Sequence, residues 1–227
     1  MDPLASRLAD VDARIADAAR SVGREAGDLT RIVVTKYHPV AMIEQLHALG
    51  VRDVGENRQQ ELTAKAEQLA GLGVRWHFVG QAQTKKARAI RAAVSVVHSV
   101  DRDRVADALD RAADDGDAPL DVLVQVNLTD DPGRGGVAPD GIERLAEHVT
   151  GCRTLRLRGI MAVAPLDVPP AAAFARLSAY ASRLRTVAPD ATWISAGMTA
   201  DFAEAIAAGA THLRIGSAIT GPRPAHG

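Results

Sequence analysis

Lys36 is the residue in this chain whose type and position most suggest covalent chemistry. It ends a short apolar run at residues 31–36, and the chain then turns through Tyr37, His38 and Pro39. A charged ammonium is costly to bury, so a lysine at the tip of a buried strand either pairs with an anion or becomes a nucleophile able to form a Schiff base. Only four of the 27 basic residues are lysines, which favours a specific role for Lys36. A lysine that extends past the strand into solvent is the alternative.

Two turns near the C-terminus suggest an anion site. One contains Ser195, Gly197 and Thr199, and the other contains Gly216 and Ser217. Phosphate binds where backbone N–H groups at a helix N-terminus meet small residues that allow close approach. Tight turns or helix caps are the alternative explanation of the glycines. A reactive lysine and a phosphate cradle together suggest pyridoxal 5'-phosphate, which needs an amine for its aldehyde and an anchor for its phosphate.

The rest of the chain supplies the elements that would position these residues. Short apolar runs alternate with segments of helical spacing, as is typical of strand–helix units in a parallel sheet. An N-terminal helix is predicted at about residues 3–22. The predicted strands are 32–36, 53–55, 76–80, 95–99, 121–127, 156–161, 192–196 and 213–216. The predicted helices between them are 40–49, 58–70, 84–92, 102–115, 140–151, 171–187 and 200–208.

Eight such units predict an α/β fold, a (β/α)8 TIM barrel at about 31–221, within a single domain at 1–227. An open doubly wound sheet is the alternative. In a barrel of this kind, active sites lie at the C-terminal ends of the strands, where Lys36 and both glycine-rich turns fall. A short extra helix is expected just after Ser217.

Composition excludes several classes of function. The net charge is −1, so no overall field attracts nucleic acid or an anionic membrane, and 3% aromatic residues argue against a platform for stacking bases. No apolar window approaches the roughly 18 residues of a membrane span. The single cysteine, Cys152, cannot form an internal disulfide, and the first residues do not resemble a signal peptide, so a cytoplasmic protein is expected. The histidines are scattered without metal-ligand spacing.

The chain also resembles a known family, the pyridoxal phosphate homeostasis proteins, once called the proline synthetase co-transcribed family, whose fold is that of the alanine racemase barrel. The resemblance covers roughly residues 5–221. The matching segments are Val33-Val34-Thr35-Lys36, Val54-Gly55-Glu56-Asn57, Trp76-His77-Phe78-Val79-Gly80, His98-Ser99-Val100-Asp101-Arg102, Val124-Gln125-Val126-Asn127, Leu157-Arg158-Gly159-Ile160-Met161-Ala162, Ile194-Ser195-Ala196-Gly197-Met198-Thr199-Ala200-Asp201 and Arg214-Ile215-Gly216-Ser217-Ala218-Ile219.

The resemblance implies roles for individual residues around the cofactor. Lys36 would bond to the cofactor aldehyde, and Arg214 would face the pyridine nitrogen. The phosphate would be held by Ser195, Gly216 and Ser217, with the turn at Gly197 and Met198 completing that side. The ring pocket would be lined by Asn57 and Met161.

Two classes of function follow from these roles. The first is a non-catalytic carrier that takes up, buffers and passes on pyridoxal 5'-phosphate, with transient contacts to apo-enzymes and a monomeric state expected. The second is a racemase or decarboxylase of the same lineage. The carrier is favoured because no second acid–base residue is found at the strand ends; Tyr37 is expected to point away by strand alternation. A sugar-phosphate barrel enzyme with a structural lysine is a third possibility. The basic cluster Lys85, Lys86, Arg88 and Arg91 is interpreted as a solvated helix face, with an anion or partner site as the alternative.

Overall fold

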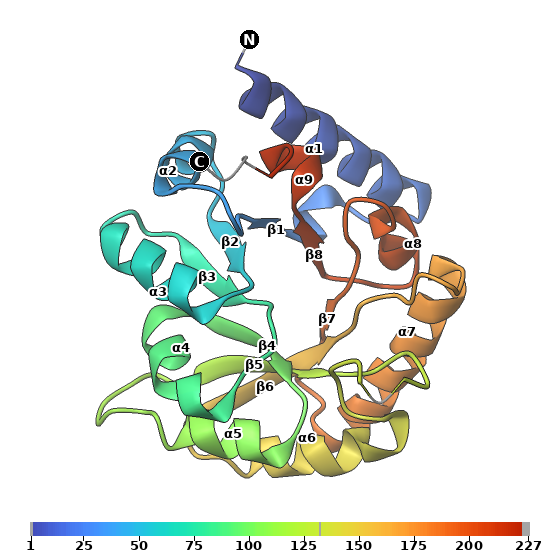
Figure 1. Ribbon diagram of the computed structural model, residues 1–227. Coiled ribbons are helices and arrows are strands. Elements are labelled where there is room, and N and C mark those ends of the chain that lie inside the picture. Colours follow the sequence, from blue (N-terminus) through green and yellow to red (C-terminus); the bar gives the residue numbers. More distant parts are fainter. Residues whose placement is uncertain (1, 132, 224–227) are drawn as a thin grey trace.

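The computed structural model describes residues 2–131 and 133–223, and within them eight parallel strands form a closed barrel (Figure 1). Each strand pairs with the next in sequence, and the first pairs with the last. The predicted (β/α)8 barrel is therefore confirmed, and the alternative prediction of an open doubly wound sheet is wrong. The strands are β1 (Thr30–Val34), β2 (Asp53–Glu56), β3 (Arg75–Phe78), β4 (Val96–Val100), β5 (Leu120–Gln125), β6 (Leu155–Met161), β7 (Trp193–Ser195) and β8 (His212–Ile215).

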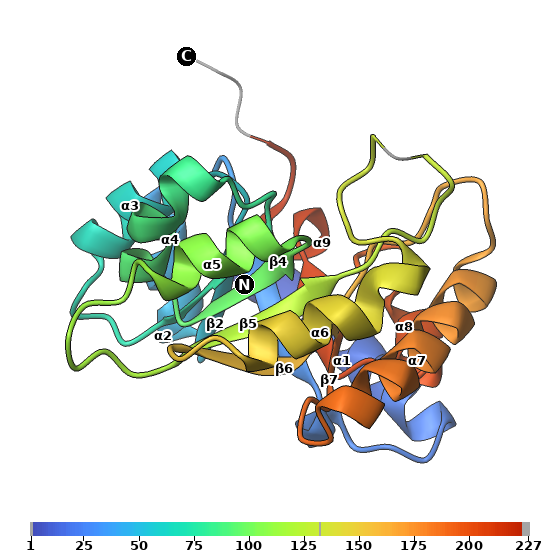
Figure 2. The same ribbon diagram turned by 90° about the horizontal axis from the view of Figure 1, so that it is seen from below.

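Helices pack around the outside of the barrel (Figure 2). The predicted helix at 84–92 begins as a tight 3-10 turn at Thr84–Lys86 and continues as α4. The helices of the described ranges are α1 (Pro3–Ser21), α2 (Val40–Ala48), α3 (Gln59–Gln68), α4 (Ala87–Ala93), α5 (Asp103–Asp110), α6 (Ile142–Thr150), α7 (Pro170–Val187), α8 (Phe202–Ala207) and α9 (Ser217–Thr220), the last being the short helix expected after the eighth strand.

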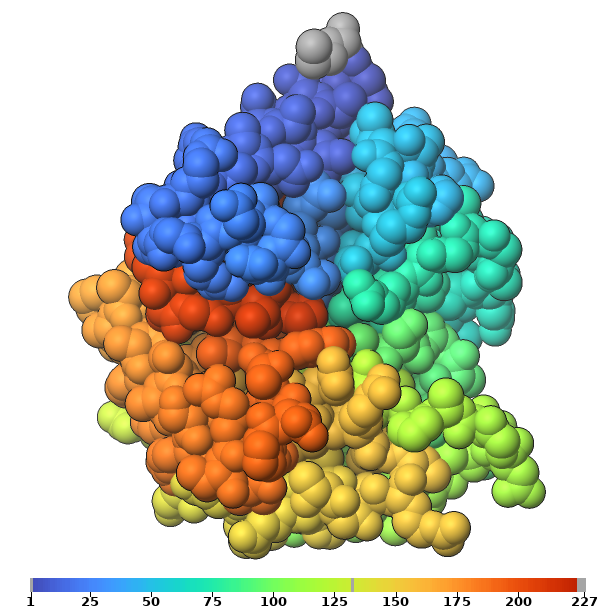
Figure 3. Space-filling view, turned by 180° about the vertical axis from the view of Figure 1, so that it is seen from behind, coloured from blue at the N-terminus to red at the C-terminus, as the bar shows by residue number. Residues whose placement is uncertain are grey.

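The N-terminal helix α1 covers the place where the barrel closes. The side chain of Asp2 accepts a hydrogen bond from the Leu4 N–H at 3.0 Å, and Pro3 occupies the first helical position, so the start of the helix is well defined. Its apolar face packs on α8 and α9. Arg7 Nε adds a 2.7 Å hydrogen bond to the Ile219 carbonyl in α9. Figure 3 shows this blue N-terminal segment beside the red C-terminal segment.

Apolar and polar residues divide between the two faces of the barrel wall. Side chains alternate along each strand, and the outward ones form the apolar core beneath the helices. Barrels of this type usually fill their interior with branched apolar residues. Here Val96, Leu123 and Met161 form only a small apolar cluster inside. Much of the remaining interior is polar and buried, and comprises His77, His98, Ser195, His212 and Arg214.

Gly159 permits the close approach of β6 to β7. Its φ is +153°, and a Cβ there would lie 1.8 Å from the Trp193 carbonyl oxygen. Any larger residue would push β7 away from β6, and with it Ser195.

None of the described helices combines the length and apolar character that crossing a membrane requires.

Candidate functional site

Lys36 lies in the turn that follows β1, and its side chain is exposed. The strand ends at Val34 instead of Lys36, so this residue is not at the tip of a buried strand. The Lys36 Nζ lies 5.8 Å from the centre of the Tyr37 ring. The expected burial of the amine is therefore wrong. Its exposure at the C-terminal mouth of the barrel makes the amine accessible to a ligand.

A buried ion pair between β2 and α3 supports this turn from outside the barrel. Lys65 Nζ donates to Glu56 Oε1 at 2.7 Å and to the Thr35 carbonyl at 2.9 Å. The Thr35 hydroxyl donates to the same Glu56 oxygen at 2.7 Å. Burial raises the pKa of Glu56, and the Lys65 ammonium opposes that rise. The pair thus fixes the backbone immediately before Lys36.

Tyr37 adopts a backbone conformation that is rare for a non-glycine residue. Its φ is 69°, and its N–H donates to Glu61 Oε2 at 2.9 Å. The ring lies 5.2 Å from the Arg58 guanidinium and 4.0 Å from that of Arg223. Strand alternation does not apply in a turn, so the argument that Tyr37 must point away from the mouth is wrong. The phenol is instead a neighbour of Lys36.

Arg214 is held inside the barrel beneath the mouth. Its Nη1 donates to Ser195 Oγ at 2.6 Å, and its Nη2 donates to the Ala162 carbonyl at 2.8 Å. Burial lowers the pKa of Arg214 to about 10, which still leaves it charged at neutral pH. The Ser195 hydroxyl is fully buried and also contacts His98 Nδ1 at 2.9 Å. This hydroxyl therefore serves the guanidinium, and the phosphate role expected for it does not fit its position.

The turns after β7 and β8 form the rim of the mouth. Gly197 has φ +90°, and a Cβ there would lie 2.8 Å from that of Ala205, so the turn requires glycine. The Met198 N–H donates to Asp201 Oδ1 at 2.6 Å and is not left over for a phosphate. Ser217 begins α9, and its N–H has no acceptor within the helix. The start of α9 therefore has a backbone N–H group that is not used by the helix itself.

Asn57 and Met161 lie at different depths. Asn57 is exposed at the end of β2, whereas Met161 is buried in the barrel interior. The position of Asn57 depends on Gly80, because a Cβ on Gly80 would lie only 1.9 Å from the Asn57 carbonyl oxygen.

Sequence reasoning missed a convergence of histidines. His77 on β3 and His98 on β4 are both fully buried, with 2.9 Å between His77 Nδ1 and His98 Nε2. His212 on β8 lies close by, with its ring centre 6.4 Å from that of His98. The signal was present, since each histidine occupies a strand position that alternates with outward-facing residues such as Trp76, Phe78, Val97 and Leu213.

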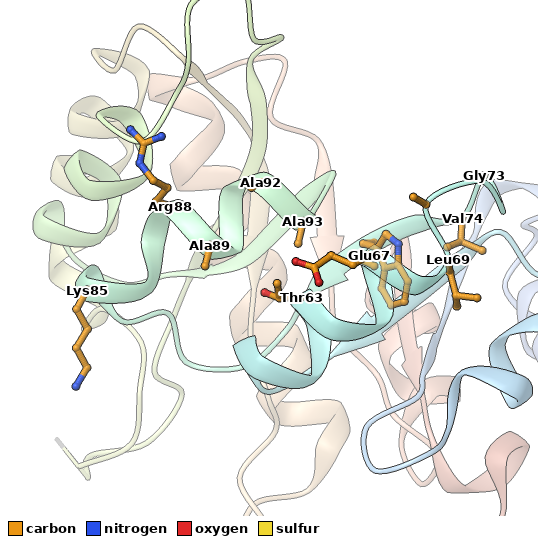
Figure 4. Close-up of a pocket in the computed structure, with 13 residues that line it drawn as sticks. Thr63, Glu67, Leu69, Gly73, Val74, Lys85, Arg88, Ala89, Ala92 and Ala93 are labelled. Carbon is orange, nitrogen blue, oxygen red and sulfur yellow. The ribbon is translucent and has the colours of Figure 1, made fainter.

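One pocket lies away from the mouth, between α3 and α4. It has a volume of about 760 Å³, and in Figure 4 Thr63 and Glu67 point into it, whereas Lys85 points away.

The basic cluster of Lys85, Lys86, Arg88 and Arg91 is not a uniformly solvated face. Arg91 is buried and donates to the carbonyls of Leu109 and Thr154, both at 3.2 Å. The interpretation of a solvated face is therefore wrong for Arg91.

Asp107, His148 and Cys152 form a cluster of potential metal ligands on the helical layer. His148 Nε2 and Asp107 Oδ1 are 2.7 Å apart, which is a hydrogen bond and shorter than the roughly 3.3 Å between two ligands of one zinc ion. Burial raises the pKa of the Cys152 thiol to about 11. The geometry is that of a hydrogen-bonded Asp–His pair beside a protonated thiol.

Comparison with known proteins first defines the class. Residues 11–224 match the family described as the alanine racemase N-terminal domain. At the level of fold alone, the chain also resembles alanine racemase from Corynebacterium glutamicum, with a TM-score of 0.66 at 15% identity over 62% of that protein. The class is thus a barrel of the alanine racemase type.

Closer relatives define the family within this class. The chain is 40% identical to a pyridoxal phosphate homeostasis protein of Pseudomonas aeruginosa, covering 98% of this chain and 97% of the relative. The corresponding Escherichia coli protein is 36% identical, with 98% of each chain covered. PipY of Synechococcus elongatus, solved with pyridoxal 5'-phosphate bound, gives a TM-score of 0.82 at 33% identity over 95% of this chain and 99% of PipY. The chain belongs to the pyridoxal phosphate homeostasis protein family, as the sequence motifs predict.

Proposed function

We propose that this protein binds pyridoxal 5'-phosphate at the C-terminal mouth of the barrel and takes part in vitamin B6 homeostasis by taking up, buffering and passing on the cofactor. The observation that carries the proposal is the adjacency of three chemically matched groups. β1 pairs with β8 so that Ile32 lies beside Arg214, which brings the Lys36 turn next to the start of α9. An amine, an anion-binding helix start and a buried guanidinium therefore share one side of the mouth.

Each of these groups fits one part of the cofactor. The cofactor supplies an aldehyde that bonds reversibly to an amine and a ring that withdraws electrons. The exposed Lys36 is the amine for the aldehyde, and Gly216 with Ser217 receives the phosphate. Arg214 donates to the ring nitrogen and cannot give up its own proton at neutral pH, so the ring nitrogen stays unprotonated and withdraws electrons weakly. Asn57, Met161 and Met198 complete the walls.

The carrier role has several parts that rest on this assignment. The names of the relatives support homeostasis over turnover. Transfer to apo-enzymes through transient contacts, a monomeric state and a cytoplasmic location belong to the same proposal, the last supported by a single cysteine that cannot form an internal disulfide.

One observation favours a second candidate, a racemase or decarboxylase. The Tyr37 ring lies beside Lys36, and a phenol can act as an acid or base close to a bound amino acid. The two functions can be distinguished by adding an amino acid to the cofactor-loaded protein in deuterated water. Sustained exchange of the α-proton, lost in Tyr37→Phe, would establish the enzyme; stoichiometric release of the cofactor without exchange supports the carrier.

The site itself is tested by covalent trapping. The protein is loaded with pyridoxal 5'-phosphate, reduced with borohydride and mapped by peptide mass spectrometry. We expect the added mass at Lys36 and its loss in Lys36→Ala, with Lys85→Ala as an exposed-lysine control. Mass at Lys65, Lys85 or Lys86 with Lys36 unmodified would refute the assignment.

A further inference from the structure

Five side chains from five strands form a continuous hydrogen-bonded path through the barrel. It starts at Asp53, at the N-terminal end of β2, where Asp53 Oδ1 lies 2.8 Å from His77 Nε2. His77 Nδ1 lies 2.9 Å from His98 Nε2, and His98 Nδ1 lies 2.9 Å from Ser195 Oγ. Ser195 Oγ accepts from Arg214 Nη1 at 2.6 Å. The path thus links the N-terminal end of the barrel to the guanidinium beneath the mouth.

The two ends of the path can act in only one way each. Arg214 has N–H groups and no lone pair to offer, so it donates to Ser195. At the other end, burial favours protonation of Asp53, but hydrogen bonds from His77 and Arg75 outweigh it and lower the pKa of Asp53 to about 2. Asp53 is therefore a carboxylate that only accepts. A donor at one end and an acceptor at the other give every bond between them the same direction.

This direction determines the protonation of both histidines. Ser195 accepts from Arg214 and donates its own hydrogen to His98 Nδ1. His98 must then carry its hydrogen on Nε2 and donate it to His77 Nδ1. His77 in turn carries its hydrogen on Nε2 and donates to Asp53. Burial lowers the pKa of both rings, which keeps them neutral, as this arrangement requires.

The opposite histidine tautomers would leave buried hydrogen bonds unformed. If His98 carried its hydrogen on Nδ1, the Ser195 oxygen would receive two donors from the described residues while its own hydrogen lost the acceptor that it now has. His77 would then have to donate from Nδ1, and its Nε2 lone pair would face the Asp53 carboxylate at 2.8 Å. A buried polar atom left without its hydrogen bond is costly, so this assignment is disfavoured.

We propose that Asp53, His77 and His98 are positioning residues that hold Ser195 as a fixed acceptor and so orient Arg214 toward the cofactor ring nitrogen. This inference deepens the proposed function and rests on it for the role of Arg214. Its consequence is that a carboxylate at the N-terminal end of the barrel influences cofactor binding at the C-terminal mouth, without touching the cofactor.

The first test reads the tautomers directly in the cofactor-free protein. Long-range proton–nitrogen NMR correlation at neutral pH is expected to show both His77 and His98 as the neutral form with hydrogen on Nε2. His212, whose Nδ1 lies 2.8 Å from the Thr211 hydroxyl, serves as a buried histidine outside the path. An Nδ1-protonated or charged ring at His77 or His98 overturns the proposal. Because no cofactor is present, this result is independent of whether the protein binds one.

The second test compares two carboxylates at the N-terminal end of the barrel. Asp53→Asn removes the charge at the end of the path. Asp121→Asn removes a carboxylate at the start of β5, which pairs with Arg156 and whose charge acts on His77, but which makes no hydrogen bond in the path. We expect Asp53→Asn to give mixed His77 tautomers and a cofactor dissociation constant raised about threefold to tenfold. Asp121→Asn should change neither.

The outcomes separate the two proposals. Equal behaviour of the two variants in both measurements overturns the path. Failure of the wild-type protein to bind the cofactor, with the expected tautomers present, instead refutes the role of Arg214 toward the ring and with it the proposed function.

Discussion

The two polar regions at the barrel mouth are built on opposite principles. The Lys36 turn is supported from outside the barrel by a charged pair, Glu56 and Lys65, packed between β2 and α3. Arg214 is supported from inside by neutral histidines and a serine. The first arrangement fixes a backbone and leaves an exposed side chain above it. The second fixes a side chain outright. A reversible covalent bond needs an amine that can move, and a directional contact to a ring needs a donor that cannot.

The two regions also differ in how they fail. A buried ion pair contributes little net stability, but removing one partner leaves an uncompensated charge. Replacing a neutral member of the interior path, such as His98, removes the two hydrogen bonds that it makes, and the cost of each lost bond is smaller. We therefore expect substitutions beneath the Lys36 turn to affect stability most, and substitutions along the interior path to affect orientation.

The largest expected effect is that of Lys65→Met. It leaves Glu56 buried without its cation and should lower the free energy of unfolding by about 3–5 kcal/mol, measured by urea denaturation at neutral pH. The double variant Lys65→Met with Glu56→Leu should recover most of this loss, since both charges are gone. Lys85→Met, on an exposed lysine, is the control. A loss below about 1 kcal/mol in Lys65→Met would show that the pair is not buried in solution.

Gly80→Ala tests the steric packing of the rim, where the ends of β2 and β3 meet, without changing any charge. The added Cβ would lie 1.9 Å from the Asn57 carbonyl oxygen, so the ends of β2 and β3 must move apart, at a cost of about 1–3 kcal/mol. Cofactor affinity should fall as well, because Asn57 moves. Gly71→Ala is the matched control, since nothing lies within 4 Å of a Cβ there. Equal unfolding free energies for the two variants would contradict the close contact.

A third prediction concerns pH and the interior histidines. Burial lowers the pKa of His212 to about 3. Below a pH of about 6.5, His212 is therefore protonated in the unfolded chain but stays neutral in the folded protein. Stability associated with His212 is therefore present at neutral pH and is lost as the pH falls. The contribution is about 1.4 kcal/mol per pH unit, and His212→Gln should remove it.

The measurement is the difference in unfolding free energy between wild type and His212→Gln at pH 7 and pH 5. Groups such as Glu56, Asp12 and Asp101, whose pKa values are raised by burial, act in the opposite direction but cancel in this difference. Parallel pH profiles for the two proteins would mean that His212 is protonated in the folded state.

The sequence predicted the barrel because its determinants are local. Each strand is a short apolar run and each helix a periodic one, and the start of α1 is given by Asp2 and Pro3. The position of Lys36, by contrast, depends on residues that are distant in the sequence. β1 ends at Val34, and the hydroxyl and carbonyl of the next residue, Thr35, are bound by Glu56 and Lys65, which belong to later elements.

The interior path was missed for a related reason. His77, His98 and Ser195 are far apart in the chain and share no spacing, and only closure of the barrel brings β4 to β7. The same closure places Ser195 beside Arg214, whose Nη1 donates to it, which is why the sequence-based role of Ser195 toward a phosphate does not fit. Polar residues at inward positions of several strands were the available signal, since an interior that is not apolar needs partners for each polar group.

The smallest expected effect sets the baseline for both regions. Arg88 and Asp114 form an ion pair at 2.9 Å, but both side chains are largely exposed, and exposed pairs typically contribute about 0–1 kcal/mol. Arg88→Ala should therefore change the free energy of unfolding by less than about 1 kcal/mol, with the difference shrinking as salt is added. If its cost in urea denaturation approached that of Lys65→Met, burial would not be what separates the two regions, and the contrast between an externally paired turn and an internally bonded guanidinium would lose its physical basis.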